Sequence, residues 1–297
     1  MLRTKAFLER YTKNLSGKTV AVTGSTGGIG QELCSYLAAL GANLILLDRN
    51  ESRSHAHRDK LKDSYPGICV ECILTDLEKI ESVKHACESL RNRPVDILIH
   101  NAGAYSIPRH LTSCGLDNVF QINFASPYYL IDAMLPTLRE RGGRVVAVGS
   151  IAHRYSKTDP NDVDFSGRTA SSKVYGNAKR YLMFGLWERF SREKGVNLAI
   201  AHPGITFTGI TAHYPKVIFA LIKHPMKVIF MRPNRAALSI LWGVFEDTEA
   251  YQWIGPKWFD VWGLPRKKKL HSCSEAEIKG IAARSEQVLN TCKEYAK

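Results

Sequence analysis

Side chains capable of proton transfer lie close together near the middle of the chain. Tyr175 and Lys179 are four residues apart in SSKVYGNAKRYLMFGLW, a run typical of a helix, so their side chains share one face. A phenol titrates at about 10, but a neighbouring ammonium favours the phenolate and lowers its pKa. Ser150 ends the apolar run GRVVAVGS and could hydrogen-bond a reacting oxygen. Each residue alone is more typical of packing or of a solvated charge, but together they could exchange a proton with an alcohol or a carbonyl.

A glycine-rich stretch, VTGSTGGIG, is a second candidate site. Gly24, Gly28 and Gly30 lie between the strand-like run KTVAVTG and the helix-like run IGQELCSYLAALG. Glycine lets the backbone turn tightly and approach a pyrophosphate, whose charge is favoured at a helix N-terminus. Many glycine-rich stretches are simple turns, so it is the position between a strand and a helix that predicts a dinucleotide site.

Residues that follow the second and third predicted strands bear on the choice of dinucleotide. Asp48 could accept hydrogen bonds from ribose hydroxyls, which favours NAD, whereas Arg49 could pair with a 2′-phosphate, which favours NADP. An aspartate at this position repels a phosphate, so the balance favours NAD, with NADP as the alternative and a solvated loop charge as another interpretation of Arg49. Asp76 could receive the adenine amino group or could simply cap the next helix.

Apolar and amphipathic runs alternate along most of the chain. This alternation predicts a parallel sheet with right-handed crossovers, that is, a single-domain α/β Rossmann fold, doubly wound, with about seven strands and helices on both faces. We expect a basic helical lead-in over residues 1–15, the domain over 16–262 and a basic helical tail over 263–297. Residues 115–140 read as one long helix that contains a proline. The predicted strands lie within 18–24, 43–48, 69–76, 95–103, 143–150 and 196–204.

Six motifs occur in the order found in the short-chain dehydrogenase/reductase family, which the chain resembles over most of its length. The segment SIAH and the long insertion before Tyr175 narrow the resemblance to the retinol-dehydrogenase and protochlorophyllide-reductase-like branch. The chain departs from the common pattern at His100, where many members have asparagine, and at Ala178, where many have serine. The motifs are TGSTGGIG (23–30), NAG (101–103), Asn123, Ser150, YGNAK (175–179) and HPGITFT (202–208).

The resemblance implies a catalytic set made of Asn123, Ser150, Tyr175 and Lys179. Tyr175 would act as general acid and base, and Ser150 would hydrogen-bond the substrate oxygen. Lys179 would hold the nicotinamide ribose, and Asn123 would anchor a water that links the lysine to solvent. No metal is expected. The implied cofactor-binding residues are Gly24, Ser25, Thr26, Gly28, Ile29, Gly30, Asp48, Arg49, Asp76, Leu77, Asn101, Ala102, Gly103, Tyr175, Lys179, Pro203, Gly204, Ile205 and Thr208.

The segment over about 209–235 occupies the place of the family's substrate lid and is apolar with interspersed lysines. An apolar lid favours a lipophilic substrate, such as a steroid, a retinoid or a long-chain alcohol. The same composition suits a helix on an anionic membrane or packing against the domain. We therefore expect an NAD(P)-dependent oxidoreductase that interconverts a hydroxyl and a carbonyl. A non-catalytic dinucleotide-binding redox sensor or a scaffold at a membrane surface is the alternative.

Charge and cysteine usage limit the partners and the compartment. A net charge of +13 favours anionic partners, but no nucleic-acid recognition motif is visible, so no nucleic acid is expected. The seven scattered cysteines fit a reducing compartment, and no apolar run is long enough to span a bilayer. These features predict a cytoplasmic protein that could associate with a membrane surface. The family resemblance adds a homodimer or homotetramer as a candidate assembly and leaves a monomer open.

Overall fold

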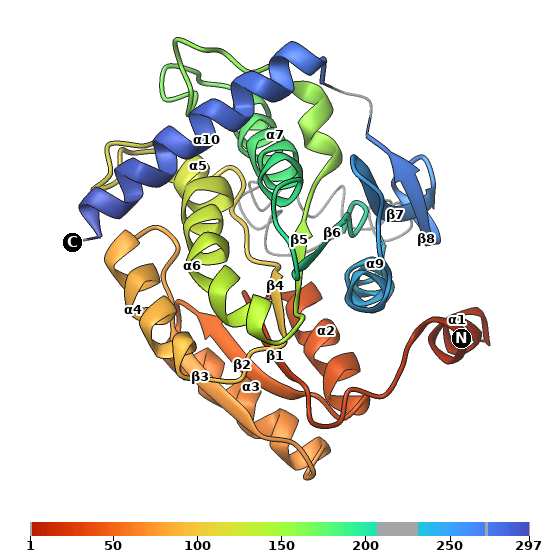
Figure 1. The fold of residues 1–297 in the computed structure, drawn as a ribbon. Helices are drawn as coiled ribbons and strands as arrows, with labels where there is room; N and C mark the ends of the chain where they lie inside the picture. Colours follow the sequence, from red (N-terminus) through yellow and green to blue (C-terminus); the bar gives the residue numbers. More distant parts are fainter. Residues whose placement is uncertain (1, 207–230, 271–272, 297) are drawn as a thin grey trace, which may run out of the picture.

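Eight strands form one sheet in the order β3-β2-β1-β4-β5-β6-β7-β8, with β8 antiparallel to β7 and the other neighbours parallel (Figure 1). The computed structural model describes residues 2–206, 231–270 and 273–296. The arrangement confirms the doubly wound Rossmann fold, with one strand more than the sequence predicts. The strands are β1 (Thr19–Thr23), β2 (Asn43–Asp48), β3 (Val70–Leu74), β4 (Ile97–His100), β5 (Arg144–Val148), β6 (Asn197–Ala201), β7 (Gln252–Trp258) and β8 (Trp262–Lys269).

Apolar side chains alternate between two cores, one on each face of the sheet. In β1, Val20 and Val22 pack into one core and Ala21 packs into the other. Every residue of β1 is buried because helices cover both faces, which explains its continuous apolar run. One face is covered by α1 (Leu2–Tyr11), α2 (Gly28–Ala39), α3 (Glu51–Ser64) and α9 (Pro233–Phe245).

The opposite face carries the helices that hold the proton-transfer residues (Figure 1). The long C-terminal helix α10 crosses α7 and α6 and packs against both. A short 3-10 helix, η2 (Ile151–Tyr155), follows β5. The helices on this face are α4 (Ile80–Arg91), α5 (Asn118–Phe120), the π-helix η1 (Gln121–Ala125), α6 (Ser126–Glu140), α7 (Ser171–Phe190) and α10 (Glu275–Tyr295).

Two expected elements differ in detail from the sequence-based prediction. Residues 118–140 are helical throughout, but a π-turn over Gln121–Ala125 interrupts the α geometry. The helical tail expected from residue 263 is not a helix at its start, because Trp262–Lys269 pairs with β7 as the edge strand β8. Pairing with β7 satisfies the backbone of this polar segment at the sheet edge, and the predicted helix begins only at Glu275.

Candidate active site

The carboxyl ends of β1, β2, β4, β5 and β6 surround a cavity of about 650 Å³. Parallel sheets of this kind bind their ligands at this edge, where neighbouring loops diverge. Both the glycine-rich loop and the proton-transfer residues reach it. The residues that bound the cavity and were predicted from the sequence are Gly24, Thr26, Gly28, Ile29, Gly30, Asp48, Arg49, Asp76, Leu77, Asn101, Ala102, Gly103, Ser150, Tyr175, Lys179, Pro203, Gly204 and Ile205.

The loop between β1 and α2 has no room for side chains at two of its glycines. Gly24 has a φ of 68°, and a Cβ there would lie 2.9 Å from the Ala102 Cα. A Cβ on Gly30 would lie 2.2 Å from the Gly24 carbonyl oxygen. Gly27 caps α2 without a side-chain hydrogen bond. The loop is therefore a cradle of backbone at a helix N-terminus, which fits the pyrophosphate of a dinucleotide.

The NAG segment after β4 is fixed to the end of β1. The Thr23 hydroxyl accepts hydrogen bonds from the backbone N–H groups of Asn101 (3.1 Å) and Ala102 (3.0 Å). The Asn101 side chain donates to the carbonyl oxygens of Thr23 and Gly24. This bonding holds small residues against the cavity, so the backbone can lie close to a flat ligand.

Asn123 lies in the π-turn and is fully buried. Its Nδ2 donates to the carbonyl oxygens of Ala104 and Val119, both at 2.8 Å, and its Oδ1 accepts from the Ala104 N–H. A Cβ on Gly103 would lie 2.8 Å from that Oδ1. The side chain thus fastens the segment after β4 and is not among the residues that line the cavity.

Tyr175 and Ser150 meet at the cavity, although 25 residues separate them in sequence. Ser150 lies two residues after β5 and caps η2, where its Oγ accepts from the Ala152 N–H at 3.2 Å. Its hydroxyl is also hydrogen-bonded to the Tyr175 phenol. Tyr105 packs edge-on against the Tyr175 ring, with 5.3 Å between centroids. Burial raises the pKa of Tyr175 to about 12, although the Ser150 hydrogen bond favours the ionised form.

Lys179 is buried one helical turn beyond Tyr175. Its Nζ lies 5.7 Å from the centroid of the Tyr175 ring and donates to the Val148 carbonyl oxygen at 2.9 Å. Burial lowers the pKa of Lys179 to about 7. The ammonium that the sequence analysis expected to depress the tyrosine pKa is therefore only partly charged at neutral pH, and the pKa of Tyr175 is raised rather than lowered.

Asp48 directs its carboxylate into the protein. Oδ2 accepts from the Ser25 hydroxyl at 2.5 Å and from the Ser54 hydroxyl at 3.0 Å. Oδ1 accepts from the Thr26 N–H and hydroxyl, both at 3.2 Å. The residue is 4% exposed. Arg49, in contrast, is exposed at the cavity, so the two neighbours have different environments.

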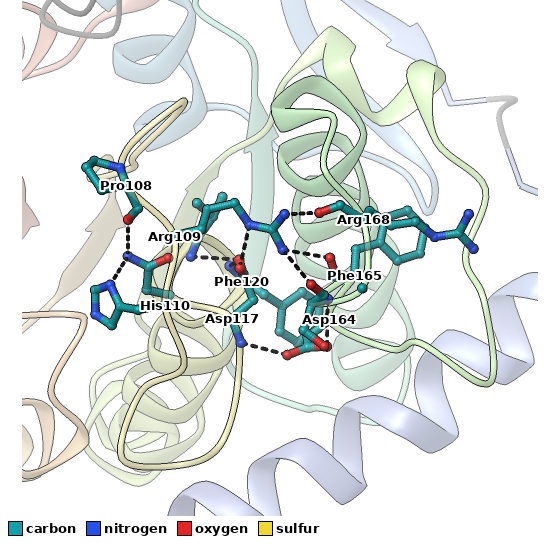
Figure 2. Close-up of polar contacts among 12 residues, drawn as sticks. Pro108, Arg109, His110, Asp117, Phe120, Asp164, Phe165 and Arg168 are labelled. Carbon is teal, nitrogen blue, oxygen red and sulfur yellow. Dashed lines mark hydrogen bonds and ion pairs between the residues drawn. The ribbon is translucent and has the colours of Figure 1, made fainter.

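The insertion before Tyr175 is anchored beside the cavity, and Figure 2 shows the contacts. Arg109 donates to the Asp117 carboxylate at 2.7 Å and to the Phe165 carbonyl oxygen at 2.8 Å, and it also contacts the Arg168 carbonyl. Asp164 accepts from the Asp117 N–H at 2.6 Å. Phe165 is buried in a small cluster against which Tyr175 packs, so the insertion is anchored next to the Tyr175 side chain.

Two of the predicted residues that the structure describes do not line the cavity. Ser25 is fully buried and donates a hydrogen bond to the Asp48 carboxylate. Asn123 donates a hydrogen bond to the Ala104 carbonyl oxygen in the segment after β4. Thr208 lies outside the described residues, as does most of the expected lid over 209–235, of which only residues 231–235 are described.

Sequence reasoning missed several residues at the cavity. Thr23 organises the segment after β4, and His202, Tyr105 and Arg53 line the cavity. Thr23 and His202 are the first residues of two recognised motifs, TGSTGGIG and HPGITFT, so position alone could have identified them. Tyr105 and Arg53 carry no such signal, because their placement depends on how a loop and a helix fold back.

Comparisons with known proteins agree with this geometry. A family model described as short chain dehydrogenase matches residues 18–162. "Short-chain dehydrogenase TIC 32 A, chloroplastic" of Brassica napus is 33% identical over 223 residues, covering 69% of each protein. Human "Polyprenol dehydrogenase" is 27% identical over 218 residues, covering 70% of this chain and 66% of that protein.

Solved structures show the same fold. An uncharacterized protein from Mycobacterium paratuberculosis superposes with a TM-score of 0.74 at 23% identity, covering 94% of this chain and 95% of its own. A short-chain dehydrogenase from Sphingobium yanoikuyae in complex with NADPH has a TM-score of 0.55 at 25% identity, covering 71% of this chain and 85% of its own.

Proposed function

Because this chain belongs to the short-chain dehydrogenase/reductase family, we propose that it interconverts a hydroxyl and a carbonyl group on a lipophilic substrate with a nicotinamide dinucleotide. One observation carries the proposal: the hydroxyls of Ser150 and Tyr175 meet at a cavity bounded by the glycine cradle, with Lys179 behind them. The bound dinucleotide would accept or supply the hydride.

Tyr175 is the proton donor and acceptor in this proposal. Its pKa of about 12 keeps the phenol protonated in the free protein, which suits donation to a carbonyl oxygen. Ser150 hydrogen-bonds the same oxygen and stabilises the negative charge that develops there. In the direction of oxidation the phenolate is required, and a charged Lys179 nearby favours it.

The burial of the Asp48 carboxylate favours NADP as the cofactor, whereas the sequence alone favoured NAD. Both carboxylate oxygens are bound by hydroxyls and a backbone N–H inside the protein, so they do not face a ribose. Arg49 and Arg53 are exposed and line the same end of the cavity. Two guanidinium groups fit a 2′-phosphate, and the Sphingobium dehydrogenase was solved with NADPH.

The substrate side of the cavity supports a lipophilic alcohol or ketone. Tyr105, Ile107, Ile151, Tyr155 and Ile205 all line the cavity, and Tyr105 and Ile107 pack in the immediate surroundings of Tyr175. Such walls favour apolar ligands, with the two hydroxyls as the polar contacts that orient one oxygen. The name of the similar polyprenol dehydrogenase also points to a long apolar alcohol.

Substitution of Tyr175 by phenylalanine tests the mechanism. Removing one hydroxyl leaves the ring packed against Tyr105, so we expect NADPH binding within twofold of wild type. Turnover should fall by at least about 100-fold, since general acid–base catalysis contributes on the order of 100-fold or more. Titration with NADPH and NADH measures cofactor binding. A panel of steroids, retinoids and long-chain alcohols and ketones, followed at the nicotinamide absorbance, measures turnover. Full activity of the variant would refute the role of Tyr175, and tight cofactor binding without any turnover would favour the non-catalytic alternative.

A further inference from the structure

The hairpin of β7 and β8 presents large apolar side chains to solvent. Trp258, Phe259, Trp262 and Leu264 are exposed, and Phe259 reaches 80%. They are four of the eight exposed large hydrophobic side chains among the described residues, and all four lie within one short segment. Single exposed apolar residues are ordinary, but a cluster of this kind marks an interaction surface.

The tip of this hairpin is held in a defined conformation. Phe259 and Asp260 both have left-handed backbone angles, with φ of 53° and 58°. The Asp260 carboxylate accepts hydrogen bonds from Lys268 at 2.6 Å and from Arg154 at 3.0 Å. These two contacts fix the position of Asp260 in the turn. A left-handed conformation is unfavourable for residues with bulky side chains. The contacts around Asp260 thus support a turn that holds Phe259 outward.

Basic residues accompany the aromatic ones. Residues 252–269 contain five basic side chains and one acidic side chain. Lys268 is paired with Asp260 and Lys267 with Glu246, whereas Lys257, Arg266 and Lys269 are exposed. The Lys257 ammonium lies over the Trp258 ring, 4.9 Å from its centroid. The surface of the hairpin is therefore aromatic at its tip and cationic along its strands.

The hairpin tip also contacts residues that line the cavity. The Asp260 carbonyl oxygen is 2.9 Å from His202 Nε2, and a Cβ on Gly204 would lie 2.8 Å from the Val261 carbonyl oxygen. His202 and Gly204 both line the cavity. The tip of the hairpin therefore packs directly against the wall of the candidate active site.

We propose that residues 257–269 bind an anionic lipid bilayer, with Trp258 and Phe259 in the headgroup region and Lys257, Arg266 and Lys269 on lipid phosphates. Tryptophan and neighbouring lysine are favoured at the boundary between lipid and water. Exposed cations add attraction to anionic headgroups. The proposal goes beyond the oxidoreductase activity and does not depend on it. No helix within the described residues is long and apolar enough to cross a membrane.

Vesicle binding by the full chain tests the proposal without any measurement of turnover. We expect cosedimentation with vesicles of phosphatidylcholine and phosphatidylserine, weaker binding to phosphatidylcholine alone, and release by high salt. Trp187, Trp242 and Trp253 are at most 9% exposed, so a blue shift of tryptophan emission on vesicle addition would come from Trp258 and Trp262. No cosedimentation with either vesicle would overturn the proposal.

Paired variants locate the contact. Trp258→Ser combined with Phe259→Ser should lower the affinity for phosphatidylserine vesicles about tenfold, because it removes the apolar part of the contact. Leu111→Ser combined with Tyr295→Ser removes two exposed apolar side chains elsewhere and should leave binding unchanged. Arg266→Gln combined with Lys269→Gln should abolish the preference for anionic lipid. Circular dichroism and thermal unfolding verify that each variant folds.

Two results would contradict the membrane contact. Equal loss of binding in the tip variant and the control variant would show that the hairpin has no special role. Self-association of wild type without vesicles, lost on Trp258→Ser and Phe259→Ser, would assign the surface to a second copy of the chain.

Discussion

Burial of Lys179 lowers the free energy of unfolding by an amount that depends on pH. Its pKa is lowered from 10.5 to about 7 in the folded protein, so between these values the unfolded chain holds a proton that the folded chain has lost. Stability rises with pH wherever the unfolded state binds more protons. The free energy of unfolding of wild type, relative to Lys179→Met, should therefore increase between pH 7 and pH 10 and stay flat below pH 6. Urea unfolding of both proteins across this range measures it, and a difference independent of pH would contradict the burial of a titrating lysine.

Arg49 and Arg53 should decide the cofactor preference. The double substitution Arg49→Ala and Arg53→Ala removes the cations that we assign to the 2′-phosphate. The Kd for NADPH should rise about tenfold or more, because charge-assisted contacts with phosphate are lost, whereas the Kd for NADH should change less than about twofold. Arg192→Ala, at an exposed position outside the cavity, is the control. A parallel rise of both dissociation constants would argue against a 2′-phosphate site.

The residue types at the site could be predicted, but their electrostatic state could not. Ser150, Tyr175 and Lys179 were correctly expected to meet, because their motifs follow neighbouring elements. The burial of Asp48 depends on Ser54, a residue of α3 whose position against β2 is set by packing and not by local pattern. The raised pKa of Tyr175 and the lowered pKa of Lys179 likewise follow from burial, which a sequence shows only indirectly.

At the scale of elements, the insertion before α7 depends on one partly buried arginine. Arg109→Met removes the pairing with Asp117 and the contact with the Phe165 carbonyl oxygen. Loss of a charged partner from a buried carboxylate should lower the free energy of unfolding by about 2 kcal/mol. Arg168→Met is the matched control: its pairs with Asp159 and Asp162 are more exposed, so it should cost no more than about 1 kcal/mol.

Urea unfolding compares the two arginine variants, and limited proteolysis shows whether the insertion opens. Cleavage within residues 156–170 should become faster in Arg109→Met and stay unchanged in Arg168→Met. Equal stability of the two variants would mean that the network in Figure 2 does not hold the insertion.

Edge elements were harder to predict than central ones. The six predicted strands are all present, because runs buried on both faces are apolar throughout. Strand β8 was not predicted, because Arg266 and the three lysines after it are all polar. A half-exposed strand usually shows an alternation of apolar and polar residues. The π-turn around Asn123 also leaves no local signal, since its extra residue is accommodated by packing and by the Asn123 contacts with Ala104.

At the scale of the whole molecule, α10 packs across α7, the helix that carries Tyr175 and Lys179. Ile281, Leu289 and Cys292 are buried, and α10 contacts both α7 and α6. A Cβ on Gly185 of α7 would lie 2.8 Å from the Ser285 Oγ, so the two helices approach closely. The face of α7 is therefore occupied by the chain's own C-terminal helix.

We expect the protein to be a monomer of 33.3 kDa in lipid-free solution at micromolar concentration. Ile281→Asp combined with Leu289→Asp should detach α10, expose the apolar face of α7 and cause self-association. Light scattering coupled to size-exclusion chromatography measures both masses. A stable wild-type dimer would show that another surface, not the one under α10, joins the copies.

The order of the sheet has a consequence for how the chain is made. Strands β2 and β3 build outward from β1 on one side, and β4 to β8 build outward on the other, each pairing with a strand that precedes it in sequence. A chain leaving the ribosome from its N-terminus can therefore add every new strand to an edge that already exists. The hairpin of β7 and β8 is the last part of the sheet to be synthesised, so the edge of β6 stays open until that hairpin has been made, and any chaperone that shields exposed edges would act on that side of the sheet.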